Sequence, residues 1–483
     1  MKYLASIIVG LLFGYYAHFN IGPSLSFVKF IFITVIFCSL VYYIKRKNIF
    51  LKNILLIVIV FGISFCFGFS YINIKDTQSI GQKNFTDTLI VKDISSNLES
   101  SRVILYSKSL DKNILLNLYS YQNIDLIPGD MVDISGDLES EKVIYPKRED
   151  NDWESFDYSR YLRSKSVDYI LYPNSLSKNV THETSVNRWT YRIRSYFYDQ
   201  LKTVMPNENA GVVLAMTLGD DRGVVENIKD SFRASGLSHV LVFSGFNFSV
   251  LVGAISVLAL SFNKKTKVIF SIFVSFLIFI LAPTSAPTAR AGVFVFYSLL
   301  AQIFNKSYNV KFIFYVFILG YTLLNPIGAI YNSSFHLSVM AVGTIIYGDI
   351  LISLITKNVV KQYFLMIFFI FISTTPYIAY TFGGVSLFSI FSNALSLPIV
   401  SLITVLGIIT ILVSCVSTIL GSVLGYVLNI FVEILLYVSK VFAISLNTIN
   451  INMSFIVLYY LFGILLYNFL LFHFKKHSNS NEN

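Results

Sequence analysis

Residues 385–413 read VSLFSIFSNALSLPIVSLITVLGIITILV, a run of 29 residues without one charged side chain. A helix needs about 20 mostly apolar residues to cross the hydrocarbon core of a bilayer, so this run is long enough to do so. Similar runs lie at 3–19, 27–44 and 54–72, and they recur from residue 238 to near the end. The pattern predicts a polytopic α-helical membrane protein.

The composition excludes a soluble protein. Hydrophobic residues make up 55% of the chain, charged residues only 13%, and the mean hydropathy is +0.66. Soluble domains carry about 25% charged residues. The cysteines Cys38, Cys66 and Cys415 lie in apolar segments at unrelated spacings, which indicates packing and neither a disulfide framework nor a metal site. No metal ion or cofactor is expected.

Basic clusters beside the apolar runs predict the topology. They lie at 45–47, 264–267, 357–361 and 475–476. Because such clusters mark the cytoplasmic side, about twelve transmembrane helices with both termini cytoplasmic satisfy every one of them. The first run lacks a small-residue cleavage site and is expected to stay as a helix. The predicted spans in the second half are 238–262, 267–282, 289–304, 311–324, 333–355, 362–380, 385–413, 418–437 and 453–473.

The same topology divides the chain into parts. Residues 1–73 form an N-terminal three-helix membrane segment, 74–186 an extracytoplasmic domain, 187–235 a connecting segment, 236–474 the main transmembrane domain and 475–483 a cytoplasmic tail. The helix count is open by about two, because 385–413 is long and 438–451 is ambiguous.

The extracytoplasmic domain differs from the rest of the chain. It is charged and rich in Asn and Asp, and turn signals such as Pro128-Gly129-Asp130 separate short alternating runs. About five short strands at this spacing predict a small β-barrel inserted between membrane segments. The expected strands are Thr88–Val91, Arg102–Tyr106, Ile114–Tyr119, Met131–Ile134 and Tyr169–Tyr172.

An amphipathic helix is expected at the start of the connecting segment. Its apolar residues recur every four positions, at Trp189, Ile193, Phe197, Leu201 and Met205. Two interpretations stay open. The helix lies on the outer membrane surface, or it packs against the core of the outer domain.

A dense motif follows this segment. Gly219-Asp220-Asp221-Arg222, then Phe232-Arg233-Ala234-Ser235-Gly236-Leu237-Ser238-His239, then Ser244-Gly245, resembles the signature of ComEC-type competence proteins. Later pieces of the same signature follow in order, at Thr288-Ala289-Arg290-Ala291, Asn325-Pro326, Phe335-His336-Leu337-Ser338, Pro376, Phe382-Gly383, Asn393 and Pro398. The resemblance covers nearly the whole chain to about residue 410.

The resemblance implies a channel for the uptake of single-stranded DNA in natural transformation. It further implies an OB-like outer domain, a plasma-membrane location, an outer DNA receptor and a cytoplasmic helicase-like ATPase. A homo-oligomer is compatible with it. Two departures stand out: Asn247 replaces a histidine of the family, and the sequence has no HxHxDH-type cluster. Many members end in a metallo-β-lactamase-like domain, so a separate nuclease is expected here. No catalytic residues and no enzyme activity are predicted.

Polar residues in the first signature span are candidates for the DNA pathway. On one continuous helix over 238–260, His239, Ser244 and Asn247 fall within an arc of roughly 140°. Such a stripe suits a pathway wall, although hydrogen bonding between helices explains it equally well. Gly236 and Gly245 offer a third arrangement, a broken helix with backbone amides beside a cavity.

Arginines supply candidate phosphate contacts. Arg290 follows a proline-punctuated run and can bind a phosphate by two parallel hydrogen bonds; the alternative is snorkelling to the interface. Arg222 and Arg233 precede the signature span and belong to the same expected funnel. Asp220 is expected to pair with these arginines or to cap a helix.

Later polar residues complete the candidates. His336 and Ser338 either line the pathway or bond neighbouring helices. Structural roles fall to the motif residues Gly219, Asp220, Gly236, Gly245, Asn393 and Pro398.

Two other functions fit the polar pattern without the resemblance. One is a membrane-embedded enzyme acting on lipid or cell-wall substrate, with Ser244 or His239 working with Asp220. The other is a secondary transporter of a smaller solute, with its site at broken helices.

Overall fold

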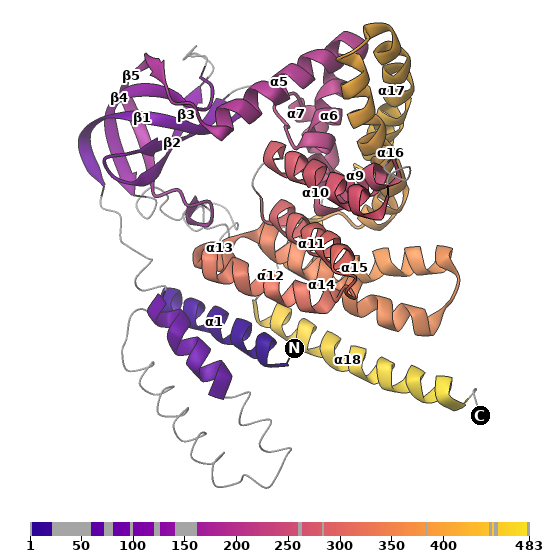
Figure 1. Cartoon of the computed structure of the whole chain (residues 1–483). Helices are drawn as coiled ribbons and strands as arrows, with labels where there is room; N and C mark the ends of the chain where they lie inside the picture. The colour runs from indigo at the N-terminus through magenta and orange to yellow at the C-terminus, as the bar shows by residue number, and fades with distance from the viewer. Residues whose placement is uncertain are drawn as a thin grey trace.

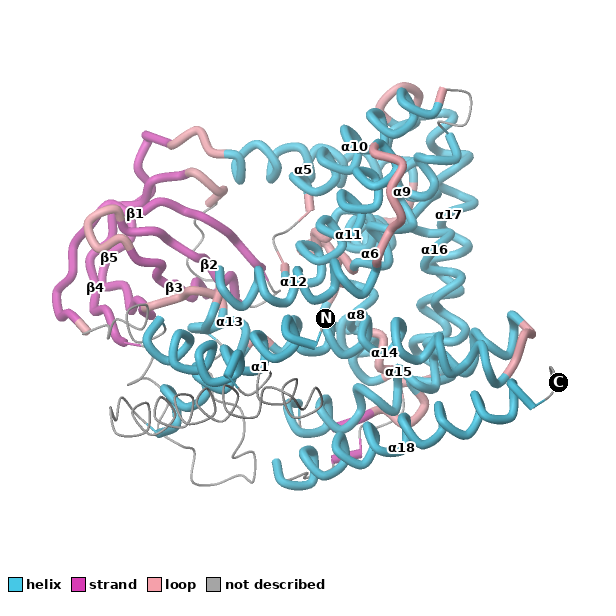
Figure 2. The backbone as a smooth tube through the Cα atoms, turned by 60° about the horizontal axis from the view of Figure 1, so that its bottom comes forward, coloured by secondary structure: helices cyan, strands magenta, loops and turns pink. Residues whose placement is uncertain are grey.

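The computed structural model describes residues 2–21, 59–71, 81–96, 100–119, 126–140, 162–258, 263–282, 285–382, 384–443, 447–448 and 453–480. Figure 1 shows a β-barrel at one end of the molecule and a helical body that fills the rest, with helix α5 (Val186–Val204) leading from one to the other. The tube view in Figure 2 shows the barrel strands gathered on one side, apart from the helices. The predicted span 27–44 lies outside the described residues.

The barrel contains all five expected strands. Its strands close in the order β1-β2-β3-β5-β4, and β3 pairs with β5 in parallel while the other neighbours are antiparallel. Alternate side chains, among them Leu89, Leu105 and Val132, point into a fully buried core because successive residues of a strand face opposite sides. The strands are β1 Gln82–Ser96, β2 Ser100–Ser107, β3 Lys112–Tyr119, β4 Asp130–Ser140 and β5 Tyr169–His182.

The helical body follows the predicted spans closely after residue 262. Five described helices are long and apolar enough to cross a membrane: Ser333–Ile355, Val359–Phe382, Ser389–Ser414, Thr418–Val441 and Ser454–Phe474. The body includes a helix over Ile59–Tyr71. Its labelled helices are α1 Lys2–Ile21, α6 Asn207–Leu218, α7 Glu226–Ala234, α8 Ser238–Leu241, α9 Gly245–Leu258, α10 Lys264–Leu281, α11 Ala286–Ile303, α12 Val310–Leu324, α13 Pro326–Tyr331, α14 Ser333–Ile355, α15 Val359–Phe382, α16 Ser389–Ser414, α17 Thr418–Val441 and α18 Met453–Ser480.

Helix α6 lies at the centre of the largest apolar core. Every residue from Asn209 to Leu218 is buried, and the helix packs against α5, α16 and α17. A short helix with no polar face needs neighbours on all sides. The residues that follow α6, which begin the family-like motif, therefore start from a fixed position.

Two sequence predictions need correction. The expected span 238–262 is not one helix: α8 ends at Leu241, and α9 begins at Gly245. The calculated arc of polar residues, which assumed continuity, is therefore wrong, and the helix is broken between Leu241 and Gly245. The run 385–413 also begins differently, because Gly384 and Val385 form strand β6 and pair with β7 (Asn447–Thr448) before α16 starts.

Candidate anion site in the helical body

The motif after α6 begins with a tight turn. Gly219 ends the helix in the left-handed conformation (φ 75°), and its amide donates to the Ala215 carbonyl over 3.0 Å. Asp220 is buried and accepts two hydrogen bonds from the Arg222 guanidinium, one of them from Nε at 2.7 Å. The ion pair expected between Asp220 and a neighbouring arginine is thus present, and it holds the loop in shape.

The next part of the motif packs on the start of α16. Gly236 has φ +76°, and a Cβ atom there would lie 2.4 Å from the Cβ of Ser389, so only glycine fits. Beside it, the Ser392 hydroxyl donates to the Ser235 carbonyl over 2.7 Å. The Asn393 amide donates to the Ser389 carbonyl within the same turn of α16. Gly236 and Asn393 therefore have a structural role where the motif packs on α16.

The break between α8 and α9 is held on both sides. The Ser244 hydroxyl accepts the Asn247 amide over 3.2 Å and so caps α9. The Asn247 side chain, only 1% exposed, donates from Nδ2 to the Met216 carbonyl of α6 over 3.0 Å. Across the break, the Thr288 hydroxyl of α11 donates to the Phe243 carbonyl. The two polar side chains after the break, at Ser244 and Asn247, thus set where α9 begins.

Arg290 of α11 lies against the start of α9. A Cβ atom on Gly245 would lie 2.6 Å from Nη2 of Arg290, so the guanidinium occupies the space that a larger residue would fill. Its Nη1 donates to the Ser338 carbonyl of α14 over 2.7 Å. Within the described part of the chain, no acidic side chain forms an ion pair with Arg290 within 4.0 Å. The guanidinium is partly buried, and no described carboxylate neutralises it by an ion pair.

The surroundings of Arg290 reinforce its positive charge. The N-terminus of a helix carries a partial positive charge, and α9 begins at Gly245, next to the guanidinium. The hydroxyl of Ser338, a residue that is 8% exposed, is buried and has no hydrogen-bond partner. A cation beside a helix N-terminus is an anion-binding arrangement, and Ser338, whose carbonyl holds the cation, also carries a hydroxyl that no described residue engages. We call Gly245, Arg290 and Ser338 the Arg290 site.

The other candidates are engaged differently. Arg222 is bonded to Asp220, and its guanidinium stacks on the Tyr191 ring at 3.9 Å. Arg233 is exposed and pairs with Asp230 on its own helix α7. These two arginines thus have acidic partners, unlike Arg290.

The two histidines differ from each other. His336 has contacts to both ring nitrogens, 2.6 Å from Nδ1 to the Tyr377 hydroxyl and 2.8 Å from Nε2 to the Ala329 carbonyl. Because a carbonyl only accepts, Nε2 carries the proton. His239 lies exposed on α8. No hydrogen bond among the described residues joins His239, Ser244 and Asp220, the residues that the enzyme alternative names.

Comparison with known proteins identifies the family. The family model described as "Competence protein" matches residues 216–475, just over half of the chain. The chain belongs to the competence protein family. The matched range contains the whole Arg290 site and most of the motif from Gly219 onward, so the residues that carried the resemblance are part of the competence domain.

One curated relative is "ComE operon protein 3" of Bacillus subtilis (strain 168), 20% identical over 386 residues. The alignment covers 76% of this competence protein and 47% of the relative, so the chain spans about half the length of that protein. No solved structure matches. In the part of the competence protein that the structure describes, no group of three or more His, Cys, Asp or Glu residues is placed to hold a metal ion.

Sequence reasoning missed two contributors. Thr288 appeared only as part of a motif, although its buried hydroxyl fixes the break before α9; its place two residues before Arg290 was the available signal. Arg194 of α5 resembled any polar residue of an amphipathic helix, and only the fold shows what surrounds it.

Proposed function

We propose that this competence protein conducts single-stranded DNA across the plasma membrane during natural transformation. The observation that carries the proposal is the Arg290 site, a cation that forms no ion pair with any described residue and lies inside a bundle of membrane-type helices. A charge inside a membrane protein is costly and usually serves a substrate or ion pathway. The phosphodiester backbone of DNA supplies the missing anion.

Each member of the Arg290 site has a distinct task in this proposal. Arg290 gives charge-assisted hydrogen bonds to a passing phosphate, as guanidinium groups do. The Ser338 hydroxyl donates a further hydrogen bond, and the absence of a Cβ atom on Gly245 lets the guanidinium and the start of α9 come together. A single contact of this kind does not read sequence, because phosphate contacts carry no base information. The pathway therefore accepts any sequence.

The remaining candidates support the same route. Ser244 and Asn247 fix the start of α9, and His336 fixes α14 next to the turn that carries Ser338. Arg222, Arg233 and His239 lie along the motif that leads to α9. We propose that the exposed Arg233 and His239 guide the strand toward it, while Arg222 holds the loop through its bond to Asp220. No residue of the chain is assigned a catalytic role.

The proposed topology has about twelve transmembrane helices with both termini cytoplasmic and the barrel outside. We infer that the barrel is OB-like, because five strands closed in the order β1-β2-β3-β5-β4 with one parallel pair suit that fold. An outer receptor delivers the DNA, and a cytoplasmic helicase-like ATPase pulls the strand. The driving force thus lies outside this chain.

Import of labelled DNA into cells tests the proposal. A full deletion is expected to abolish import, and Arg290→Ala to reduce it at least tenfold while DNA still binds outside. Arg290→Lys keeps the charge without the planar guanidinium and is expected to restore part of the import. Membrane insertion of each variant is checked by the amount of full-length protein in the membrane fraction. Unchanged import in the full deletion would overturn the function itself.

A further inference from the structure

Helix α5 joins the barrel to the helical body through specific bonds. At its start, the Asn187 side chain donates to the Lys92 carbonyl of β1 over 3.1 Å. One residue later, the Arg188 guanidinium donates to the buried Asp130 carboxylate of β4 over 2.7 Å. Later in the helix, Leu201 is buried in the core around α6, and Phe197 and Tyr198 pack against that core. A DNA strand that moves from the barrel to the helical bundle would therefore move along α5.

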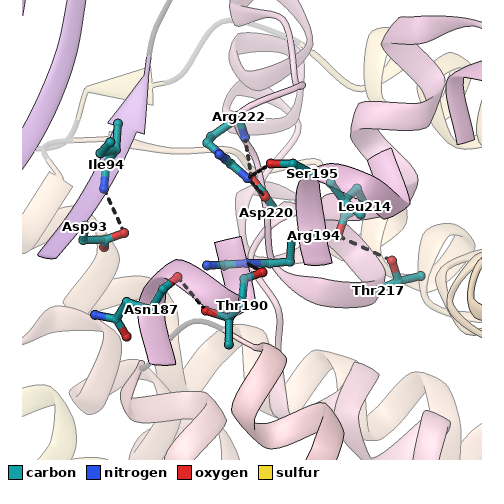
Figure 3. Close-up of polar contacts among 10 residues, drawn as sticks. All are labelled: Asp93, Ile94, Asn187, Thr190, Arg194, Ser195, Leu214, Thr217, Asp220 and Arg222. Carbon is teal, nitrogen blue, oxygen red and sulfur yellow. Dashed lines mark hydrogen bonds and ion pairs between the residues drawn. The ribbon is translucent and has the colours of Figure 1, made fainter. Parts of the chain in front are cut away.

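Arg194 lies in the middle of this connection. Its Nε donates to the Thr190 carbonyl one turn earlier over a long 3.4 Å. Within the described residues, its guanidinium forms no ion pair within 4.0 Å, and no hydrogen bond from its terminal nitrogens is found. Figure 3 shows the Arg194 guanidinium extended toward the side on which Asp93 of the barrel lies, with Asp220 and Arg222 above it in this view.

The two carboxylates near Arg194 are already engaged. Asp220 is held by two bonds from Arg222, so this pair adds little net charge. Asp93 is exposed, and its Oδ1 accepts the Ile94 amide over 2.9 Å. Water screens an exposed carboxylate much more than a buried one. Neither group therefore neutralises Arg194 at close range.

The electrostatics agree with this geometry. Burial lowers the pKa of the Arg194 guanidinium from its ordinary value, and Arg222 lowers it further, while Asp220 and Asp93 offset only part of the effect. Arginine stays protonated at neutral pH even so. A partly buried cation whose desolvation is not repaid by a partner favours an incoming anion.

We propose that Arg194 binds a backbone phosphate of the single strand at the junction between barrel and bundle, ahead of the Arg290 site. This inference rests on the proposed function. It adds a contact outside the matched competence domain, on the helix that connects the outer domain to it. The two terminal nitrogens supply the parallel hydrogen bonds that a phosphate takes.

A structural role for Arg194 makes the opposite prediction about Asp93. If Arg194 were an electrostatic clasp between barrel and body, then removing either Arg194 or Asp93 would loosen the junction and weaken DNA binding alike. If Arg194 is a phosphate contact, Asp93 repels the ligand, and its neutralisation strengthens binding. The signs of the two single substitutions therefore separate the roles.

The test measures binding of a fluorescein-labelled oligothymidylate to the full chain in detergent, over a series of salt concentrations. Arg194→Gln is expected to weaken binding several-fold and to reduce the slope of log K against log salt by about 0.7, the value for one phosphate on a single strand. Asp93→Asn is expected to strengthen binding. Arg192→Gln, an exposed arginine of the same helix, is the matched control and is expected to keep the slope.

An unchanged slope in Arg194→Gln, or weaker binding in Asp93→Asn, would overturn the proposal. Thermal unfolding of each variant in the same detergent shows that the fold is kept. DNA import in the full deletion separates this inference from the function on which it rests. If the deletion abolishes import while Arg194→Gln binds and imports like the wild type, only the Arg194 contact fails.

Discussion

The hydroxyl of Tyr363 donates a hydrogen bond of 2.9 Å to the carbonyl of Ala394, the residue four positions before Pro398. Proline has no amide hydrogen, so the carbonyl four residues earlier lacks its helical donor. Tyr363 of α15 supplies that donor to α16. The Tyr459 hydroxyl does the same for Ile372, four residues before Pro376, over 3.0 Å. Both prolines inside these long helices are thus matched by a tyrosine from another helix.

Tyr363→Phe should therefore destabilise the protein by about 1 kcal/mol, the usual size of an interhelical bond in a membrane protein. Thermal unfolding in detergent measures the loss. Tyr426→Phe, at a tyrosine that is 72% exposed on α17, should cost little and serves as the control.

The same bond can be tested by a double substitution. In a Pro398→Ala background, a backbone amide becomes available to Ala394, so Tyr363→Phe should cost less than it does in the wild type. An equal cost in both backgrounds would show that the tyrosine does not compensate for the proline.

At position 247, a substitution that keeps a hydrogen-bond donor should be tolerated, and one that places an acceptor there should destabilise the protein. Its Nδ2 donates to the Met216 carbonyl in a fully buried position. Asn247→Asp places a carboxylate against that carbonyl and should destabilise the protein by roughly 3 kcal/mol, more than Asn247→Ala. Asn247→His keeps an N–H donor and should cost least. Unfolding midpoints of the three variants give the order, and an Asp variant as stable as the wild type would exclude this bond.

Ser338 should show a separation of stability from function. Its buried hydroxyl has no partner, so Ser338→Ala should leave stability unchanged or raise it by up to about 1 kcal/mol. Import of DNA should fall at the same time, because a donor to the phosphate is lost. Thermal unfolding and import are measured on the same variant. Loss of both together would indicate that the hydroxyl is structural.

The stability of the barrel should depend on pH in the acid range through Asp130. Burial alone raises the pKa of its carboxyl, but hydrogen bonds from Lys178 and Arg188 outweigh burial and hold the pKa below its ordinary value. A carboxyl whose pKa is lowered by folding stabilises the protein above the unfolded pKa of about 3.9, and that stabilisation is lost as the pH falls through the lowered folded pKa.

Asp130→Asn isolates this term. At pH 7 the variant should be less stable by on the order of 3 kcal/mol, because Arg188 loses its charged partner in a buried place. The gap between wild type and variant should narrow below about pH 3.9. Unfolding measured from pH 7 to pH 3 checks this, and a gap that stays constant over the whole range would contradict the pairing.

Much of the fold follows from sequence patterns with a clear physical origin. The run 333–355 and helix α14 coincide, because a mostly apolar stretch of this length, with Asp349 as its one acidic residue, has one stable form in a bilayer. All five strands were predicted, because alternation and turn residues define them locally. The break at 242–244 was only one of several alternatives, since it depends on bonds from Thr288 and Asn247 to distant backbone.

The candidate site was predicted only in part, because it too depends on contacts between residues far apart in the sequence. Arg290 and Ser338 were named from the sequence, but only the tertiary structure brings these residues of two helices into contact. His336 and Ser338 look alike as polar residues in an apolar span, yet one has partners on both ring nitrogens and the other has a free hydroxyl. Sequence alone gives no signal for that difference.

The most direct test of the Arg290 site uses two glycines of helix α9. Gly245→Ala places a methyl group where the Arg290 guanidinium now lies, and the flexible arginine can yield without unfolding the protein. Gly253→Ala meets nothing within 4 Å and is the matched control. The account predicts that Gly245→Ala reduces DNA import at least tenfold with normal membrane levels, while Gly253→Ala imports like the wild type. Equal import by the two variants would contradict a phosphate contact at Arg290.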